Sequence, residues 1–218
     1  MRQTKQAISG SRGCQPKVVN MSIRMLMVIM FIVFLWGCFL GSSSLFFLLQ
    51  TGSEQAEQVF NQVEQILGSM PEIKPYTVDT VLAIFMRNFE VALLSVALGL
   101  LVVVPGIIVF VNGFVLGMVL VLVSMNPEAS IFAGLAAIIP HGIIELPALF
   151  LAASVGTRIG IDFWRYVIKK KDKESLTRLL TFAPLLLLIA VSLLFIASLI
   201  ETYATPYILE TFFGIKIP

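Results

Sequence analysis

Residues 81–125 read VLAIFMRNFEVALLSVALGLLVVVPGIIVFVNGFVLGMVLVLVSM, and this stretch decides the fold. A transmembrane helix needs about 20 consecutive apolar residues, so the run is roughly twice as long as one span requires. Pro105 and Gly106 lie in its middle and mark the natural break between two helices. The sequence therefore predicts helices at about 82–104 and 106–124, joined by a tight turn.

Three further apolar runs extend this pattern in both directions. They predict helices over residues 25–49, about 131–154 and about 176–200. The first run is too long for the core of a signal peptide and is expected to remain as a span. The other four helices form one membrane domain within residues 81–218. Together they predict an all-α bundle of five transmembrane helices.

The composition indicates that lipid is the solvent for this bundle. Hydrophobic residues make up 58% of the chain and charged residues only 13%, against about 45–50% and 25% in ordinary soluble domains. A net charge of +2 is too small to indicate a nucleic-acid partner. The implied partner is the lipid bilayer, and we expect a multi-pass protein of the plasma membrane.

The distribution of charge predicts the orientation of the bundle. Residues 1–24 form a basic tail without an acidic residue, and the segment 157–175 is also strongly basic. Because Lys and Arg concentrate in cytoplasmic loops, both segments are expected in the cytoplasm, together with the N-terminus. Residues 50–80 are acidic and carry apolar residues at helical spacing, which predicts an extracytoplasmic amphipathic segment. Residues 201–218 are also expected outside.

Polar residues within the predicted spans are candidates for function. His141 and Glu145 are four residues apart in the fourth helix, so they share one helical face. A charged side chain at the bilayer centre costs about 2.5–3.5 kcal/mol on insertion scales and usually faces a partner inside the bundle. Asn112 in the third helix is expected at a similar depth. Asn88 in the second helix completes this candidate intramembrane polar site.

Pro140, Gly142 and Pro147 surround the pair of ionisable residues. These residues are expected to loosen or break the helix and to free backbone carbonyls, because proline has no N–H to donate. Broken helices near the middle of the membrane line the substrate and ion sites of many transporters. The pattern predicts a helix break in the fourth span.

Three interpretations of His141 and Glu145 stay open. The pair can be a structural lock between helices, a proton or ion site, or a metal or catalytic centre. Zinc sites use three or four protein ligands, and His141 is the only histidine of the chain. A metal at this pair would therefore need a ligand from a second subunit, and no cofactor is predicted.

A second polar cluster is predicted near the outer surface. Arg87 and Glu90 lie in the first turns of the second helix, and Glu201 lies at the outer end of the fifth. Arg87 with either glutamate would form an ion pair at the membrane interface. We expect this pair to hold helices together.

Recognised enzyme signatures are missing from the sequence. It contains no G-x-S-x-G, P-loop or H-E-x-x-H motif. The chain is therefore predicted to be non-enzymatic.

Glycines repeat four positions apart in three places, at Gly37 and Gly41, Gly113 and Gly117, and Gly156 and Gly160. In lipid, such pairs let two helix backbones approach closely. The spacing predicts either tight packing within the chain or the face of a homodimer, and does not choose between them.

Several of these residues fall within motifs that resemble a known family. The motifs are FMRN at 85–88, VNGFVLG at 111–117, IPHGIIELPA at 139–148 and IETYATP at 200–206. Together they are similar to the stage II sporulation protein M family of bacterial and archaeal membrane proteins. The resemblance covers most of the chain from the second helix onward.

The resemblance implies a helical membrane domain with a scaffold role. For the sporulation member of the family, that role is to help localise a peptidoglycan-degrading complex during engulfment of the forespore. We therefore expect a scaffold that works as a homodimer and recruits other membrane or cell-envelope proteins. The alternative is a transporter or channel for a small ion or solute, with His141, Glu145 and Asn112 lining a mid-membrane site.

Overall fold

The computed structural model describes residues 22–50, 74–125, 131–169 and 173–215, without the side chains of Ile131, His141 and Lys169. The regular elements within these ranges are all helical. In chain order they are α1 (Ile23–Gln50), α3 (Val78–Ala97), the 3₁₀ turn η1 (Leu98–Leu101), α4 (Val104–Met125), α5 (Ile131–Lys169), α6 (Lys173–Leu199), the π-helical turn η2 (Ile200–Ala204) and α7 (Thr205–Phe213).

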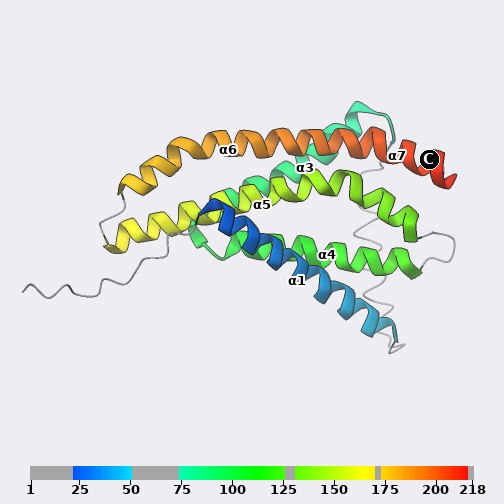
Figure 1. Cartoon of the computed structure of the whole chain (residues 1–218), viewed down its shortest axis with the longest axis horizontal. Coiled ribbons are helices and arrows are strands. Elements are labelled where there is room, and N and C mark those ends of the chain that lie inside the picture. Colours follow the sequence, from blue (N-terminus) through cyan, green and yellow to red (C-terminus); the bar gives the residue numbers. More distant parts are fainter. Residues whose placement is uncertain (1–21, 51–73, 126–130, 170–172, 216–218) are drawn as a thin grey trace, which may run out of the picture.

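Five helices in the described ranges are long and apolar enough to cross a membrane. The predicted all-α transmembrane bundle is thereby confirmed. α1 begins, α3 turns into α4, and α5 gives way to α6 at one end of the molecule, which we call the basic end (Figure 1). The first and the last of these three places are the segments that the charge distribution assigns to the cytoplasm. The predicted amphipathic helix falls largely on residues 51–73, outside the described ranges.

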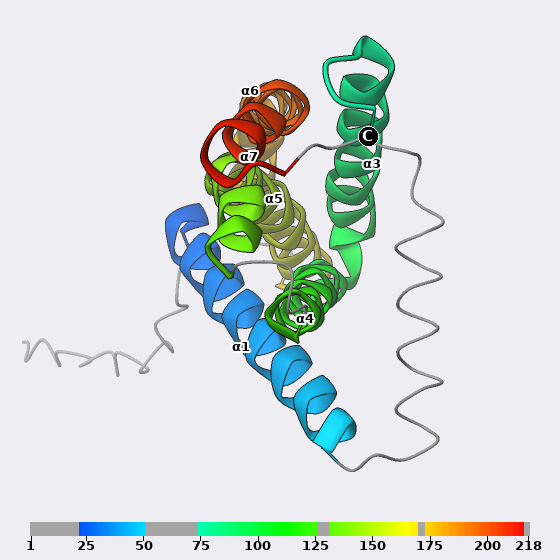
Figure 2. The ribbon, with the colours of Figure 1, turned by 90° about the vertical axis from the view of Figure 1, so that its right-hand side faces the viewer.

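Helix α5 is the centre of the bundle. It contacts α1, α3, α4, α6 and α7, and the view along the bundle shows these helices arranged around it (Figure 2). On one side, Phe150 packs edge-to-face against Phe34 of α1, with ring centroids 5.6 Å apart. On the other side, alanines of α3, α5 and α6 form a second core cluster around Leu194. The small alanine side chains allow these three helices to lie close together.

Helices α1 and α4 make the most extensive contact of any two elements. A methyl group at Gly37 or Gly41 of α1 would overlap the backbone carbonyl of Phe110 or Phe114 in α4. Reciprocally, a methyl group at Gly113 or Gly117 of α4 would overlap carbonyls of α1. The two glycine pairs therefore face each other within one chain, and we call this contact the α1–α4 seam.

The third glycine pair also packs inside the chain. A methyl group at Gly156 would overlap the Ser95 carbonyl of α3, and one at Gly160 would overlap the carbonyl of Gly99 in η1. Gly99 in turn lies against the Gly156 backbone. All three glycine pairs are thus used for packing within the chain rather than for presenting a face to another copy.

The turn between α3 and α4 falls three residues before the predicted break. Val102 lies there with φ 51° and ψ −48°, a conformation that a β-branched residue rarely adopts. Its carbonyl accepts a hydrogen bond from Thr157 Oγ1 of α5, at 3.4 Å. Pro105 lies in the first turn of α4. Backbone N–H groups in the first turn have no partner within the helix, so the N–H that proline lacks is not needed there.

Helix α5 is longer than predicted and is continuous. Its 39 residues extend over about 58 Å, whereas the hydrocarbon core of a bilayer is about 30 Å thick. The segment 157–169, expected as a basic loop, is the helical end of α5 and extends past the α3–α4 turn at the basic end (Figure 1). At the other end, the fifth span continues through η2 and α7 to Phe213 rather than ending near residue 200.

The break predicted at Pro140, Gly142 and Pro147 is not present. Both prolines lie inside α5, and the helix continues from Ile131 to Lys169. Transmembrane helices tolerate proline where neighbouring groups and small backbone adjustments satisfy the freed carbonyls. The carbonyls left without an α5 N–H are those of residues 136 and 143, so the loss is local.

Candidate functional site

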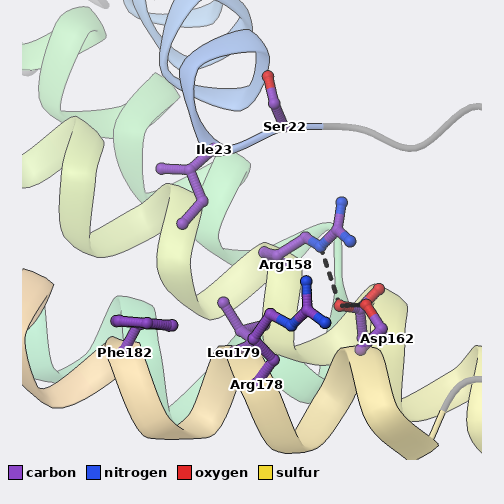
Figure 3. A pocket seen from close by; sticks show the side chains of 8 residues that line it. Ser22, Ile23, Arg158, Asp162, Arg178, Leu179 and Phe182 are labelled. Atoms are coloured by element: carbon purple, nitrogen blue, oxygen red, sulfur yellow. Dashed lines mark hydrogen bonds and ion pairs between the residues drawn. The ribbon is translucent and has the colours of Figure 1, made fainter.

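A cavity of about 340 Å³ lies at the basic end, between the start of α1, the C-terminal half of α5 and the first turns of α6 (Figure 3). Its wall has a polar part and an apolar part. The polar part consists of Ser22, Arg158, Asp162, Ser175 and Arg178, and the apolar part of Ile23, Leu179 and Phe182. We call it the basic-end cavity.

Asp162 is the centre of the polar wall. Its side chain is 1% exposed, and its Oδ2 accepts hydrogen bonds from Arg158 Nε at 2.9 Å and from Ser175 Oγ at 3.1 Å. Arg165 Nη1 lies 3.6 Å from the other carboxylate oxygen. Oδ1 itself has no hydrogen-bond partner within the described structure. One buried carboxylate is therefore shared by two arginines of its own helix and one serine of α6.

Contacts between α5 and the α3–α4 turn fix the position of this carboxylate. Trp164 Nε1 donates a 2.8 Å hydrogen bond to the Leu100 carbonyl, two residues beyond Asp162 along α5. One to two turns earlier, Gly156 and Gly160 lie against the backbone of α3 and η1. With both sides of the segment held to backbone atoms, the Arg158 and Asp162 side chains project from a rigid support.

Arg178 brings a second guanidinium to the cavity from α6. It forms a 3.1 Å ion pair with Glu174, one turn earlier on the same helix. That pair is solvent-exposed, whereas Arg158 is only 8% exposed. Figure 3 shows the Arg178 guanidinium turned toward Arg158 and Asp162 across the cavity. Among the charged residues of the cavity wall, two arginines face one aspartate.

From the sequence alone, these residues are only a basic segment that sets the orientation of the bundle. The signal for a site was the acidic residue within it: Asp162 lies four residues after Arg158 and three before Arg165. Residues at these spacings are neighbours on one helical face. The pattern becomes informative once residues 157–169 are recognised as helix rather than loop.

The predicted mid-membrane polar residues are placed as follows. Asn112 is half-buried and its Nδ2 donates a 2.8 Å hydrogen bond to the Ile108 carbonyl of its own helix. Glu145 is half-buried on α5, and the His141 side chain lies outside the described part. Asn112 and Glu145 belong to helices whose core residues Val109 and Leu149 share one buried cluster. The common site of Asn112 and Glu145 stays a prediction.

The predicted outer cluster is divided between the middle of α3, which carries Arg87 and Glu90, and the π-helical turn η2, which carries Glu201. Glu201 is half-buried in the π-helical turn η2, and the positive charge of Arg87 interacts with it electrostatically. Glu90 is exposed, and Asn88, assigned to the mid-membrane site, is half-buried in the middle of α3. Nearby, the Tyr76 N–H donates to the Thr202 carbonyl at 3.2 Å. This hydrogen bond connects the residues that precede α3 to η2. Turns of π-helix such as η2 are frequent at functional sites.

Metal-ligating residues do not gather within the described ranges. No group of three or more His, Cys, Asp or Glu side chains there is placed to hold a metal ion. Because the His141 side chain lies outside the description, the idea of a metal shared between His141 and Glu145 stays an untested prediction.

The chain is similar to known proteins over most of its length. A family model described as stage II sporulation protein M matches residues 25–206. An uncharacterized protein of Methanocaldococcus jannaschii is 34% identical over 98 residues, which are 44% of this chain and 54% of that protein. A second uncharacterized protein of this organism is 29% identical over 136 residues, 62% of this chain and 59% of the relative. The chain thus spans just over half of each relative. No solved structure matches it.

Proposed function

The chain belongs to the stage II sporulation protein M family, and from this premise we propose that it is a non-enzymatic scaffold that recruits partner proteins to the plasma membrane. The observation that carries the proposal is the end of α5 beyond the α3–α4 turn. There Tyr166, Val167 and Ile168 are exposed on a continuous helix, Ile168 at 74%.

The position of these residues argues against lipid as their only neighbour. They follow Trp164 and Arg165, and aromatic residues and arginines concentrate at the membrane–water interface. With α5 about 58 Å long, the helix continues past the interface at its charged end. Exposed apolar side chains in such a place are typical of protein-binding surfaces.

The charge around this surface favours a particular kind of partner. Arg165 precedes this surface in the sequence and Lys173 follows it, and residues 169–171 are all lysines. We infer a membrane or cell-envelope protein whose binding surface combines apolar side chains with acidic ones. Complementary charge would steer the encounter, and the apolar contact would supply most of the affinity.

Co-purification tests the proposal. Tagged wild-type protein, a Val167→Ser/Ile168→Ser double variant and a Val103→Ser control would be extracted in mild detergent. Val103 is also an exposed valine at the basic end, 66% accessible, but it lies in the α3–α4 turn. We expect a stoichiometric membrane or envelope partner with wild type and control, and at least tenfold less with the double variant. Failure to recover any partner with wild type, or equal recovery with the double variant, would refute the proposal.

A homodimer is part of the proposal, but it needs a face other than the glycine pairs. The three glycine pairs are already packed within the chain. A dimer would have to use the outer surfaces of the bundle, so Gly→Ala changes in the α1–α4 seam should disturb folding rather than the dimerisation equilibrium. Analytical ultracentrifugation in a density-matched detergent measures the latter directly.

A further inference from the structure

The basic-end cavity combines two chemistries that seldom meet in a purely structural contact. Arg158 and Arg178 point into one end, while Ile23, Leu179 and Phe182 line the other. We propose that this cavity binds one anionic phospholipid of the adjacent leaflet. The phosphate lies between the two guanidinium groups, and the start of an acyl chain lies along the apolar wall.

The balance of charge favours an anion. Asp162 is a member of the wall, but Arg158 and Arg165 both pair with it and its side chain is 1% exposed. Among the charged residues that line the cavity in the described part of the chain, two arginines accompany one carboxylate, a net charge of +1. A phosphodiester would therefore enter a positive site in which guanidinium groups can donate paired hydrogen bonds.

The depth of the cavity matches that of lipid head groups. At the opposite end, the rings of Tyr76 and Tyr203 lie tilted against each other with centroids 6.3 Å apart, and they mark one membrane interface. Arg178 lies 25 residues before Tyr203 along nearly continuous helix, which corresponds to about 37 Å. This exceeds the roughly 30 Å of the hydrocarbon core and falls within the 40–45 Å that includes head groups. Arg178 is thus placed at the phosphate level of the other leaflet.

The apolar wall distinguishes a lipid from a soluble phosphate. Phe182 is 56% exposed and lies one turn deeper into the membrane than Arg178. From the guanidinium groups toward Phe182, the wall changes from charged to apolar in the direction of the bilayer centre. A free phosphate would use only the charged half, whereas a phospholipid occupies both. Basic pockets between transmembrane helices are a known means of binding anionic head groups.

Native mass spectrometry with defined lipids tests the site. The purified full-length protein would be offered phosphatidylglycerol or phosphatidylcholine at equal molar ratio, and separately inorganic phosphate and glycerol 3-phosphate. Arg178→Gln removes an exposed cavity charge without burying an unpaired group. Leu179→Trp fills the apolar part without changing charge, and Lys173→Gln is the matched control on the same helix outside the wall. Far-UV circular dichroism and melting show that each variant is folded.

We expect phosphatidylglycerol to be retained at least fivefold over phosphatidylcholine by wild type and by Lys173→Gln. Arg178→Gln should weaken retention roughly fivefold, the effect of about one charge near an anionic surface. Leu179→Trp should weaken it as well. Equal retention of the two lipids, unchanged retention by both cavity variants, or binding of inorganic phosphate as strong as that of phosphatidylglycerol would each overturn the proposal.

Discussion

Adding a single methyl group to the α1–α4 seam should push α1 away from α4 and destabilise the bundle. A Cβ at Gly41 would overlap the Phe114 carbonyl oxygen and lie 2.8 Å from its carbonyl carbon. A Cβ at Gly117 would overlap the Cys38 carbonyl oxygen and lie 2.9 Å from Ser42 N. Ordinary contacts begin near 3.4 Å. Because the obstructing atoms are backbone, no rotamer change relieves the overlap and the helices must separate.

The expected cost follows from two opposing terms. Gly→Ala inside a helix normally gains about 0.5–1 kcal/mol. Overpacking of a close contact costs about 1–3 kcal/mol or more. Separation also lengthens the 3.0 Å hydrogen bond from Ser42 Oγ to the Gly117 carbonyl, and such bonds between membrane helices contribute about 0.6 kcal/mol on average. We therefore expect Gly41→Ala and Gly117→Ala each to lower the free energy of unfolding by about 1–3 kcal/mol.

Two other glycines of the chain are matched controls. A Cβ at Gly106 or Gly142 would meet nothing within 4 Å, so alanine there should be neutral or stabilise by up to about 1 kcal/mol. Unfolding in mixed micelles with increasing SDS, followed by circular dichroism, measures all four variants. The double variant Gly41→Ala/Gly117→Ala should lose less than the sum of the single losses, because one separation relieves both overlaps. Seam variants as stable as the controls would show that α1 and α4 are not packed as described.

Five further changes probe the network at the basic end, the strained turn and the mid-membrane site. Asp162→Asn leaves two arginines without their carboxylate and should lower stability by about 3–5 kcal/mol, whereas Glu174→Gln in an exposed pair should change it by less than about 1 kcal/mol. Trp164→Phe loses a hydrogen bond to the α3–α4 turn and should lower stability by about 1 kcal/mol. Val102→Gly should stabilise the protein by about 1 kcal/mol, because it relieves about 1–3 kcal/mol of strain at positive φ and adds the entropic cost of glycine. Denaturant midpoints measure the stability of all these variants. A Val102→Gly variant less stable than wild type would contradict the strained turn. If the alternative channel function holds, Glu145→Gln should abolish ion or solute flux in liposomes, and unchanged flux would exclude Glu145 from the pathway.

The number of spans could be predicted from sequence because hydropathy alone decides it. A run of apolar residues has no stable position other than lipid, so the five spans appear in the structure near their predicted places. The end of α5 could not be predicted in this way. Its charged residues resemble a loop by composition, but Arg158, Asp162 and Arg165 pair along one helical face and keep the helix intact.

The partners of the glycine pairs also required the structure. A spacing of four identifies a surface for close approach but not the helix that approaches it. The same limit applies to Pro140 and Pro147, because the surrounding bundle decides whether a proline breaks a membrane helix. The basic-end cavity joins residues from α1, α5 and α6 that are up to 160 positions apart in sequence, and no local pattern brings them together.

The α1–α4 seam also implies an order of events during biosynthesis. Among the described elements, α1 contacts α4 and α5 but not α3, the next described helix along the chain. Membrane helices first insert singly and associate afterwards. After insertion, Gly37 and Gly41 of α1 therefore lack their contact with α4 until the translocon has released α4. A nascent chain halted after α3 would display an unoccupied helix-binding surface, and completion of α4 is the step that removes it.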